Sequence, residues 1–389
     1  MNRASTPASP APSRHPHAIA ASSVSTGSSA PGASAPTASV GTPGSLEAIA
    51  ATFVGPDEAD LASIAPLSGG LINDTYAVGS GWVLQRLHPI FAATVNLDIA
   101  ALTPTLRDRG VPVPSIAPSQ GGEPWTTVAA GPHAGVWRLL SRLPGHSVVR
   151  VASPQHAASA ARLVATFHAA LLGIDHRFAF SRPGAHDTEA HVAGLRQALA
   201  ERTGHRLHAE VAALAQTIEQ LWAAMPPLPP LPARIVHGDL KIANLLFDDT
   251  GAAIGIVDLD TMAWSTIDVE LGDAMRSWCN RSAEDEPARL DLDIFAAAMR
   301  GYAAGGRLDA AERAAVVHGF GRIALELSAR FAKDALVESY FRWDPKRAAG
   351  HGEHNLMRAR GQLGLAQAVA NQVGALHALV EAAFAESVG

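Results

Sequence analysis

Residues 235–261, IVHGDLKIANLLFDDTGAAIGIVDLDT, decide the fold that we expect of this chain. The stretch contains two short apolar runs, 235–236 and 254–257, and polar residues follow each of them. Short buried strands that deliver polar side chains into a cleft have this pattern. Asp239 comes shortly after the first run and Asp258 directly after the second. We therefore expect both carboxylates to reach one cleft.

The polar residues of this stretch are the types that phosphoryl transfer needs: a carboxylate near the attacking hydroxyl, oxygen ligands for a metal ion and a positive charge near the transferred group. We expect Asp239 to act as the base. Lys241 would neutralise the phosphoryl group, and the alternative for it is a solvated loop lysine. Asn244 and Asp258, with Asp260 as a candidate second carboxylate, are expected to bind Mg²⁺, which prefers hard oxygen ligands. The sequence thus predicts a kinase that uses ATP and Mg²⁺.

The spacing makes this prediction more specific than either half of the stretch alone. His237 to Asn244 follows the H-x-D-x-x-x-x-N pattern of kinase catalytic loops, and an acidic strand end follows it. An Asp at the end of a strand is more often a helix cap or a turn residue. Both halves in order, separated by one turn, argue against a chance match. We expect His237 to brace the loop by hydrogen bonding rather than to transfer protons.

The rest of the chain predicts an α+β fold with two lobes, as in protein kinases. Extended runs at 75–78, 82–87 and 136–143, with a helix at 96–109, indicate a small N-terminal lobe with an antiparallel sheet. Apolar residues at helical spacing predict helices over 155–172, 188–224 and most of 287–386. We place a nucleotide-binding lobe at 47–143 and a mainly helical lobe with the catalytic loop at 144–389.

Composition excludes several other classes of protein. Residues 1–46 are rich in Ser, Ala, Pro and Gly and contain no Asp or Glu, so we expect a disordered tail. The net charge of −6 comes without a basic block, which argues against nucleic acid as a partner. No apolar run is long enough to span a membrane. The single cysteine, Cys279, fits a reducing compartment, and we expect a cytoplasmic protein whose oligomeric state the sequence leaves open.

On the residues 237–244 and 256–260, the chain resembles the aminoglycoside phosphotransferase/choline kinase superfamily. Residues 68–76 resemble the first hairpin of that family, which lies over the nucleotide phosphates; an ordinary hairpin turn is the alternative. The resemblance implies that the amides of Gly69 and Gly70 approach the phosphates and that Asn73 or Thr75 adds a donor. Residues 139–145 resemble the interlobe hinge that holds adenine. There we assign Ser141 and Leu143 to the nucleotide site.

Within that superfamily, the chain is similar to N-acetylhexosamine 1-kinases. The segments that carry this resemblance are 72–76, 83–86, 258–261, 271–276, 328–334 and 355–360. It implies phosphorylation of the anomeric hydroxyl of an N-acetylated hexosamine, with Arg330 reaching the substrate. Asp273 and Arg276 would shape the floor of the cleft, or else form a salt bridge at a helix start. Those enzymes carry Asn-Asp-Thr-Lys in the catalytic loop, where this chain has Gly-Asp-Leu-Lys at 238–241.

The phosphate-binding lysine expected in the third strand is absent from residues 82–86. Arg86 is the cation that we expect to replace it, because a guanidinium makes bidentate phosphate contacts. Strand alternation places Gln85 and Arg86 on opposite faces, so only one of them can point into the cleft. Asp98 is the only acidic residue early in the following helix that could form an ion pair with the strand cation.

The sequence leaves two alternative functions open. One is a kinase of another acceptor, such as an amino alcohol, a homoserine-like metabolite or an aminoglycoside. The other is a pseudokinase that binds nucleotide without turnover.

Overall fold

A computed structural model describes residues 44–67 and 73–386 of the chain. Most of the tail predicted at 1–46, together with Gly69 and Gly70, therefore lies outside the described residues. The first described helix, α1 (Leu46–Ala50), begins at the end of that predicted tail. The Ser45 hydroxyl caps it by accepting a hydrogen bond from the backbone N–H of Ala48 at 3.3 Å.

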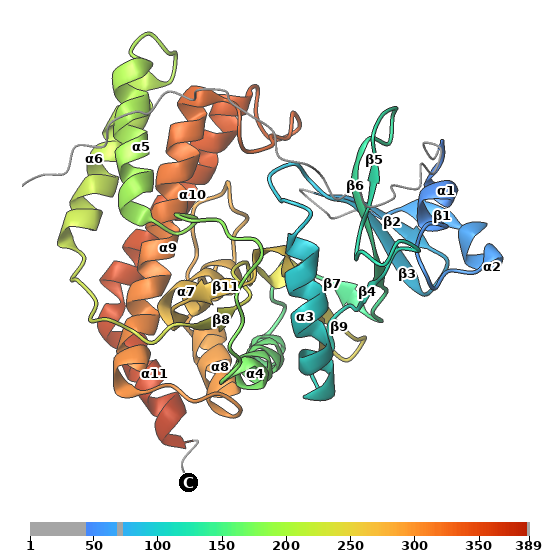
Figure 1. The fold of residues 1–389 in the computed structure, drawn as a ribbon. Coiled ribbons are helices and arrows are strands. Elements are labelled where there is room, and N and C mark those ends of the chain that lie inside the picture. The colour runs from blue at the N-terminus through green and yellow to red at the C-terminus, as the bar shows by residue number, and fades with distance from the viewer. Residues whose placement is uncertain (1–43, 68–72, 387–389) are drawn as a thin grey trace, which may run out of the picture. The chain divides into compact units, whose positions relative to one another are not determined.

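The N-terminal lobe is built on an antiparallel sheet with the strand order β1-β2-β3-β6-β4, to which β5 is added through β6 (Figure 1). Val78, Leu84, Trp137 and Leu139 form the fully buried centre of its core. The strands are β1 (Ile64–Pro66), β2 (Asp74–Val78), β3 (Trp82–Arg86), β4 (Ile116–Ala117), β5 (Thr126–Val128) and β6 (Gly135–Ser141). Short helix α2 (Glu58–Leu61) precedes β1, and α3 (Val95–Asp108) follows β3.

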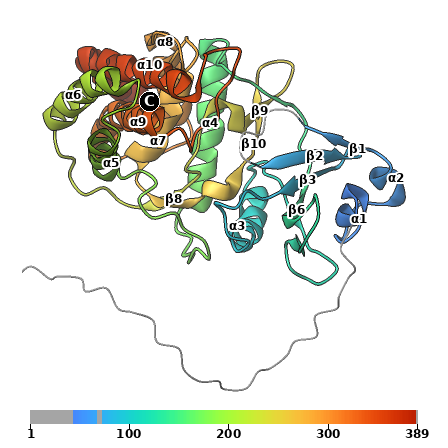
Figure 2. The ribbon, with the colours of Figure 1, turned by 90° about the horizontal axis from the view of Figure 1, so that it is seen from above.

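Helix α3 lies between this sheet and the helices of the C-terminal lobe in both views (Figures 1 and 2). Its apolar face, which includes Ile99, Leu102 and Leu106, shares one core with Phe167 of the C-terminal lobe and Ile235 near the catalytic loop. The chain thus packs the sheet-bearing lobe against the strands that carry the predicted catalytic residues. Helix α3 therefore holds the N-terminal wall of the cleft against the C-terminal wall.

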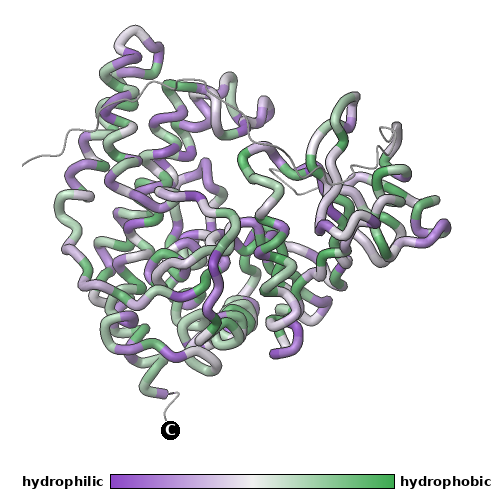
Figure 3. Tube along the Cα trace, in the orientation of Figure 1, coloured by the Kyte–Doolittle hydropathy of each residue, from purple (hydrophilic) through white to green (hydrophobic). Residues whose placement is uncertain are grey.

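The C-terminal lobe is mainly helical. Hydrophobic and hydrophilic segments alternate along its helices, as expected when one face of each is buried (Figure 3). Helix α9, which has 28 residues, packs against α5, α7 and α10. The helices are α4 (Pro154–Leu171), α5 (Thr188–Glu201), α6 (His208–Ala224), α7 (Ile267–Trp278), α8 (Leu292–Ala303), α9 (Ala310–Val337), α10 (His351–Asn371) and α11 (Val373–Glu386).

One predicted helix was wrong: residues 188–224 form two helices, α5 and α6. The break contains Gly204, and the backbone N–H of His205 bonds the carbonyl of Arg202 at 2.9 Å in a tight turn. The ring of His205 also accepts the N–H of Leu207 at 3.2 Å, which satisfies a donor that a continuous helix would have used.

Short strands hold the predicted catalytic residues. Strand β8 (Arg234–Val236) pairs with β11 (Ala263–Ser265), while β9 (Leu245–Phe247) pairs with β10 (Ala253–Ile256) and with β7 (His146–Ser147). Two 3₁₀ turns, Ile242–Asn244 and Leu259–Thr261, lie at the strand ends. The α+β prediction with two lobes is confirmed. In the part of the chain that is described, no single helix is both long and apolar enough to cross a membrane; α10 and α11 meet that test only when taken together, as a pair bent by 71°.

Candidate active site

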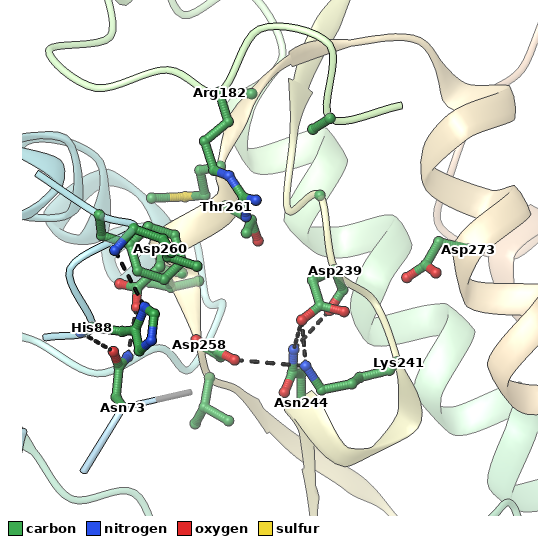
Figure 4. A pocket seen from close by; sticks show the side chains of 18 of the residues that line it. Asn73, His88, Arg182, Asp239, Lys241, Asn244, Asp258, Asp260, Thr261 and Asp273 are labelled. Carbon is green, nitrogen blue, oxygen red and sulfur yellow. Dashed lines mark hydrogen bonds and ion pairs between the residues drawn. The ribbon is translucent and has the colours of Figure 1, made fainter. Parts of the chain in front are cut away.

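A cavity of about 1640 Å³ contains nearly all the described residues to which the sequence assigned a function. Its walls come from β2, β3 and β6 of the N-terminal lobe, and from the catalytic loop, α7 and α9 of the C-terminal lobe. Figure 4 shows Asp239, Lys241, Asn244 and Asp258 close together, with Asp273 on the α7 side.

Buried groups hold the backbone of the catalytic loop, residues 237–244. Gly238 has φ +80°, a left-handed conformation that suits glycine. The Glu270 carboxylate of α7 accepts the backbone N–H groups of His237 at 2.8 Å and Gly238 at 2.9 Å. His237 is fully buried and its Nε2–H donates to the carbonyl oxygen of Val257 at 2.9 Å, so it braces the loop. Burial would raise the pKa of Glu270, but its hydrogen bonds and the nearby histidines hold it below the usual value.

Asp239 is the centre of a small polar cluster at the loop. Its carboxylate forms an ion pair with Lys241 and accepts a hydrogen bond from the Asn244 side-chain amide at 3.2 Å. The same amide donates to the backbone carbonyl of Asp239 at 2.7 Å. Burial alone would lower the pKa of Lys241, but the carboxylates of Asp239 and Asp258 raise it. Lys241 therefore carries its charge between the two acids.

Asp258 lies opposite Asp239, and its Oδ2 is 3.8 Å from the amine of Lys241. Its φ of +66° is unusual for a non-glycine residue, and such conformations persist where the surroundings enforce them. Desolvation in the cleft, followed by the neighbouring carboxylate of Asp260, raises the pKa of Asp258 above its usual value. This carboxylate is therefore one that a bound cation would stabilise.

Asp260 has partners within the protein. Its two carboxylate oxygens form a bidentate ion pair with the Arg138 guanidinium of β6, and one of them also accepts the Asn73 amide at 2.9 Å. The other end of the Asn73 side chain accepts the backbone N–H of His88 at 2.9 Å. Both polar ends of Asn73 and both oxygens of Asp260 are thus used within the protein. The assignments of Asn73 to the phosphates and of Asp260 to the metal ion therefore stay predictions, since these contacts leave one amide hydrogen of Asn73 unused and both residues line the cavity.

The open question about β3 is resolved in favour of Gln85. Gln85 and Thr75 line the cavity, and the Gln85 amide donates to the Thr75 hydroxyl at 3.2 Å. Arg86 does not line it. Its Nε donates to the Asp74 carboxylate at 2.8 Å, and its Nη1 reaches the carbonyl of Pro132 at 3.1 Å. The prediction that Arg86 binds phosphate was therefore wrong, because strand alternation turns it away from the cleft.

Asp98 is not the partner of a strand cation. It is buried on α3 and accepts the backbone N–H groups of Ala179 at 2.8 Å and Phe180 at 3.0 Å, and its Oδ1 lies 2.9 Å from Nε2 of His176. These bonds anchor the segment between α4 and α5 to the N-terminal lobe. That segment forms one side of the cavity.

The predicted hinge residues Ser141 and Leu143 line the cavity at the end of β6. The Ser141 hydroxyl accepts the backbone N–H of Ser115 at 2.9 Å, which fixes the strand end. The surrounding wall is apolar, as a site for a planar ring requires; it includes Val83, Leu140, Leu246 and Val257.

Asp273 and Arg276 both lie in the cavity wall on α7, and they also form the salt bridge that was the alternative, with Nη2 and Oδ1 2.8 Å apart. Arg276 additionally approaches Glu284 at 3.7 Å, and Arg358 approaches the other oxygen of Glu284 at 3.7 Å. Burial would raise the pKa of Asp273, but the adjacent Arg276 guanidinium holds it below the usual value.

Arg330 lines the same end of the cavity from α9 and stacks on Tyr340 and Phe341, at 6.0 and 5.7 Å from the ring centroids. One turn earlier on α9, the buried carboxylate of Glu326 lies 3.9 Å from Arg330. Glu326 also contacts Nδ1 of His186 at 3.1 Å and accepts the Thr188 hydroxyl at 2.8 Å.

Arg138, Glu270 and Glu326 are site residues that the sequence reasoning did not identify. Each of them lies far along the chain from its partners: Arg138 is 122 residues from Asp260, and Glu326 is 138 residues from Thr188. The only signal in the sequence is a charged residue in an otherwise apolar run, such as Arg138 within 136–140.

A two-lobed fold that brings a carboxylate base, an amide and a second carboxylate into one interlobe cleft defines a phosphotransferase of the kinase-like class. The chain matches the model of the phosphotransferase enzyme family over residues 63–311, and it belongs to that family. It is a small-molecule kinase, a phosphotransferase with an alcohol group as acceptor.

Solved structures support the fold. A microcompartment-associated aminopropanol kinase is similar at a TM-score of 0.58 and 17% identity, covering 85% of this chain and 97% of its own. Amicoumacin kinase in complex with AMP-PNP and Ca²⁺ is similar at a TM-score of 0.56 and 15% identity, and the match covers 81% of this chain and 91% of that kinase. A choline/ethanolamine kinase family protein from Mesorhizobium loti is similar at a TM-score of 0.51 and 20% identity, and the match covers 87% of this chain and 95% of that protein. At these identities the similarity establishes the fold and leaves the acceptor open.

Proposed function

We propose that this enzyme transfers the γ-phosphate of ATP to the anomeric hydroxyl of an N-acetylhexosamine. Asp239 would orient the attacking hydroxyl and accept its proton. Lys241, which is paired with Asp239 and close to Asp258, would offset the negative charge of the transferred group. Ser141 and Leu143 would hold adenine, and Thr75 would serve the phosphate end beside Gln85.

Mg²⁺ fits the donor set at the centre of the cleft. Asp258 and the side-chain oxygen of Asn244 would hold the ion, since the amide nitrogen of Asn244 already donates to Asp239. Within residues 44–67 and 73–386, no three His, Cys, Asp or Glu side chains are grouped as a metal site. Mg²⁺ needs only one or two protein ligands where nucleotide phosphates and waters complete its coordination shell. The ion would supply charge neutralisation on the nucleotide phosphates.

The acceptor end of the cavity supports a neutral, hydroxyl-rich acceptor, and this observation carries the proposal. Three carboxylates there already have cationic partners: Asp273 pairs with Arg276, Glu284 with Arg276 and Arg358, and Glu326 with His186 and Arg330. The exposed Asp187, also in this wall, instead caps α5 by accepting the backbone N–H of Ala190 at 2.9 Å. An ammonium-bearing acceptor would need an unpaired acid, since burying an uncompensated charge is costly. Paired arginines and carboxylates instead offer donors and acceptors to hydroxyl and amide groups.

Two exposed aromatic side chains add to this. Trp264 and Tyr340 both line the cavity and are 45% and 54% exposed, so each ring can offer an apolar face to a ligand. The indole N–H of Trp264 already donates to the carbonyl of His176 at 2.8 Å, which fixes the orientation of that ring. This combination suits the alternating apolar and hydroxyl-bearing surfaces of a sugar ring. It favours an acceptor with a sugar ring over a small amino alcohol.

The test is an ADP-release assay against N-acetylhexosamines, unmodified hexoses, amino alcohols and aminoglycosides. We expect the highest kcat/KM with an N-acetylhexosamine, and a product whose phosphate is attached at the anomeric carbon by ³¹P NMR. Asp239→Asn should lower kcat by about 10²- to 10⁴-fold, the usual contribution of a general base, while nucleotide binding persists. A preference for an amino alcohol or an aminoglycoside would refute the acceptor assignment. Binding of nucleotide without turnover on any acceptor would favour a pseudokinase.

A further inference from the structure

A buried cluster joins the two lobes directly beside the predicted metal ligand. Arg138 and Asp260 are each only 1% exposed, although both side chains are charged. Arg138 comes from β6 of the N-terminal lobe, and Asp260 follows β10 of the C-terminal lobe. Asn73 and Gln85, also from the N-terminal lobe, complete the cluster, which we call the interlobe clamp (Arg138, Asp260, Asn73 and Gln85).

The guanidinium of Arg138 is fully used inside the protein. Its Nε and Nη2 donate to the Gln85 side-chain oxygen at 2.9 and 2.7 Å. Its Nη2 also donates to Asp260 at 2.9 Å, while Nη1 bonds the other Asp260 oxygen and lies 3.3 Å from the Asn96 side-chain oxygen. Arg138 lies directly opposite Gln85 in the pairing of β6 with β3, and it has no donor left for a phosphate.

The clamp determines where Asp258 lies. Asp260 is two residues beyond Asp258, and the backbone between β10 and the 3₁₀ turn Leu259–Thr261 takes the left-handed conformation at Asp258. A bidentate arginine–carboxylate pair fixes both distance and orientation, which a single contact does not. Holding Asp260 from the N-terminal lobe therefore holds this strained turn, and with it the Asp258 carboxylate.

We propose that Arg138 is a positioning residue: through Asp260 it sets the Asp258 carboxylate for the metal–nucleotide complex and couples that site to the N-terminal lobe. Asp260 is then an anchor of the clamp and not a metal ligand. The inference rests on the proposed role of Asp258, and it is independent of which acceptor the enzyme uses.

The experiment compares Arg138→Gln, Asp260→Asn and the double variant by calorimetric titration of Mn²⁺ in the presence of AMP-PNP, which needs no turnover. We expect each single variant to weaken Mn²⁺ binding by about 10- to 100-fold, as loss of a group that orients a metal ligand typically does. The double variant should bind Mn²⁺ at least as tightly as the single variant with the lower affinity, because both changes break the same Arg138–Asp260 ion pair. It also removes the unpaired buried charge that could prevent a single variant from folding. The KM for ATP should rise in all three.

Two controls separate the alternatives. Arg86→Gln removes an arginine ion pair from the same sheet, outside the cavity, and should leave Mn²⁺ binding unchanged. Asp258→Asn should weaken Mn²⁺ binding more than any clamp variant; if it does not, the assigned role of Asp258 fails. If Asp260→Asn weakens Mn²⁺ binding while Arg138→Gln leaves it equal or tighter, Asp260 is a direct ligand and the proposal is overturned. It is also overturned if the clamp variants lower Tm but keep wild-type Mn²⁺ affinity and KM.

Discussion

At the scale of single residues, Gly238 is the position where the catalytic loop depends most directly on a missing side chain. Its φ of +80° is left-handed, and a Cβ built there would overlap the carbonyl oxygen of Thr261. Thr261 in turn donates its hydroxyl to the carbonyl of His237 at 2.8 Å. A side chain at 238 would therefore push the loop away from the turn that carries Asp258 and Asp260.

We predict that Gly238→Ala lowers both stability and kcat. The left-handed backbone alone costs about 1–2 kcal/mol for a residue with a Cβ, and the overlap with Thr261 adds to it. Gly251→Ala is the matched control. Its φ is +84°, but the nearest atom to a new Cβ is 3.9 Å away, so it should lose stability without losing kcat. Urea unfolding and steady-state kinetics measure the two effects; equal kcat in both variants would contradict the prediction.

The residues that lie close together in the sequence are the part of the site that could be predicted. Asp239, Asn244 and Asp258 were placed in one cleft because their spacing within a short stretch requires it. Arg138 was missed and Arg86 was wrongly preferred, because the choice between them depends on which face of the sheet meets the other lobe. That is a property of tertiary packing, and no local pattern encodes it.

At the scale of elements, the same contrast holds for the fold. Strands β2, β3 and β6 and helices α3 and α4 follow from alternation and helical spacing within a few residues of their observed bounds. The break between α5 and α6 was missed, since Gly204 is the only breaker there and single glycines occur within helices. The segment between α4 and α5 has no periodic pattern; contacts with Asp98 and Glu326 fix it from α3 and α9.

We expect the contact between that segment and α9 to make acceptor binding depend on pH, because it lies in the proposed acceptor wall. Burial would lower the pKa of His186, but its hydrogen bond to Glu326, and then the charges of Glu326 and Asp273, raise it. Burial would raise the pKa of Glu326, but the hydrogen bond from His186 lowers it. Arg330 on α9 and His191 on α5 also face this pair, each 3.9 Å from Glu326. The protonated pair therefore stabilises the acceptor wall below the unfolded-state pKa of about 6.5, and the contribution disappears as pH rises through the raised pKa of His186.

We predict that the KM for the acceptor rises about fivefold as pH increases through this range, while the KM for ATP changes little. Fivefold corresponds to about 1 kcal/mol, the upper range for a partly exposed ion pair. His186→Gln keeps a donor for Glu326 but cannot titrate, so it should flatten the profile. His205→Gln, whose partner Glu338 lies outside the cavity, is the control and should retain it. A flat wild-type profile, or one that His186→Gln leaves unchanged, would count against this mechanism.

At the scale of the whole molecule, the cavity takes its walls from both lobes, and the shared core around α3 joins them. A nucleotide in this cavity would contact the β6 hinge on one side and Asp258 on the other. Its binding energy should therefore stabilise the folded chain against global unfolding, since the unfolded chain has no assembled site. The metal-dependent part of that stabilisation would pass through Asp258 and Asn244.

We predict that AMP-PNP with Mg²⁺ at about 100 times its Kd stabilises the wild type by about 2.7 kcal/mol, and that EDTA removes most of this gain. Asp258→Asn should lose the metal-dependent increase in Tm. Asp239→Asn should keep it, because Asp239 is assigned to the acceptor hydroxyl and not to the metal. Differential scanning fluorimetry with and without Mg²⁺ measures all three proteins under one set of conditions. Equal metal-dependent shifts in the two variants would mean that Asp258 does not hold the ion, and a loss of the shift in Asp239→Asn would move Asp239 into the metal site.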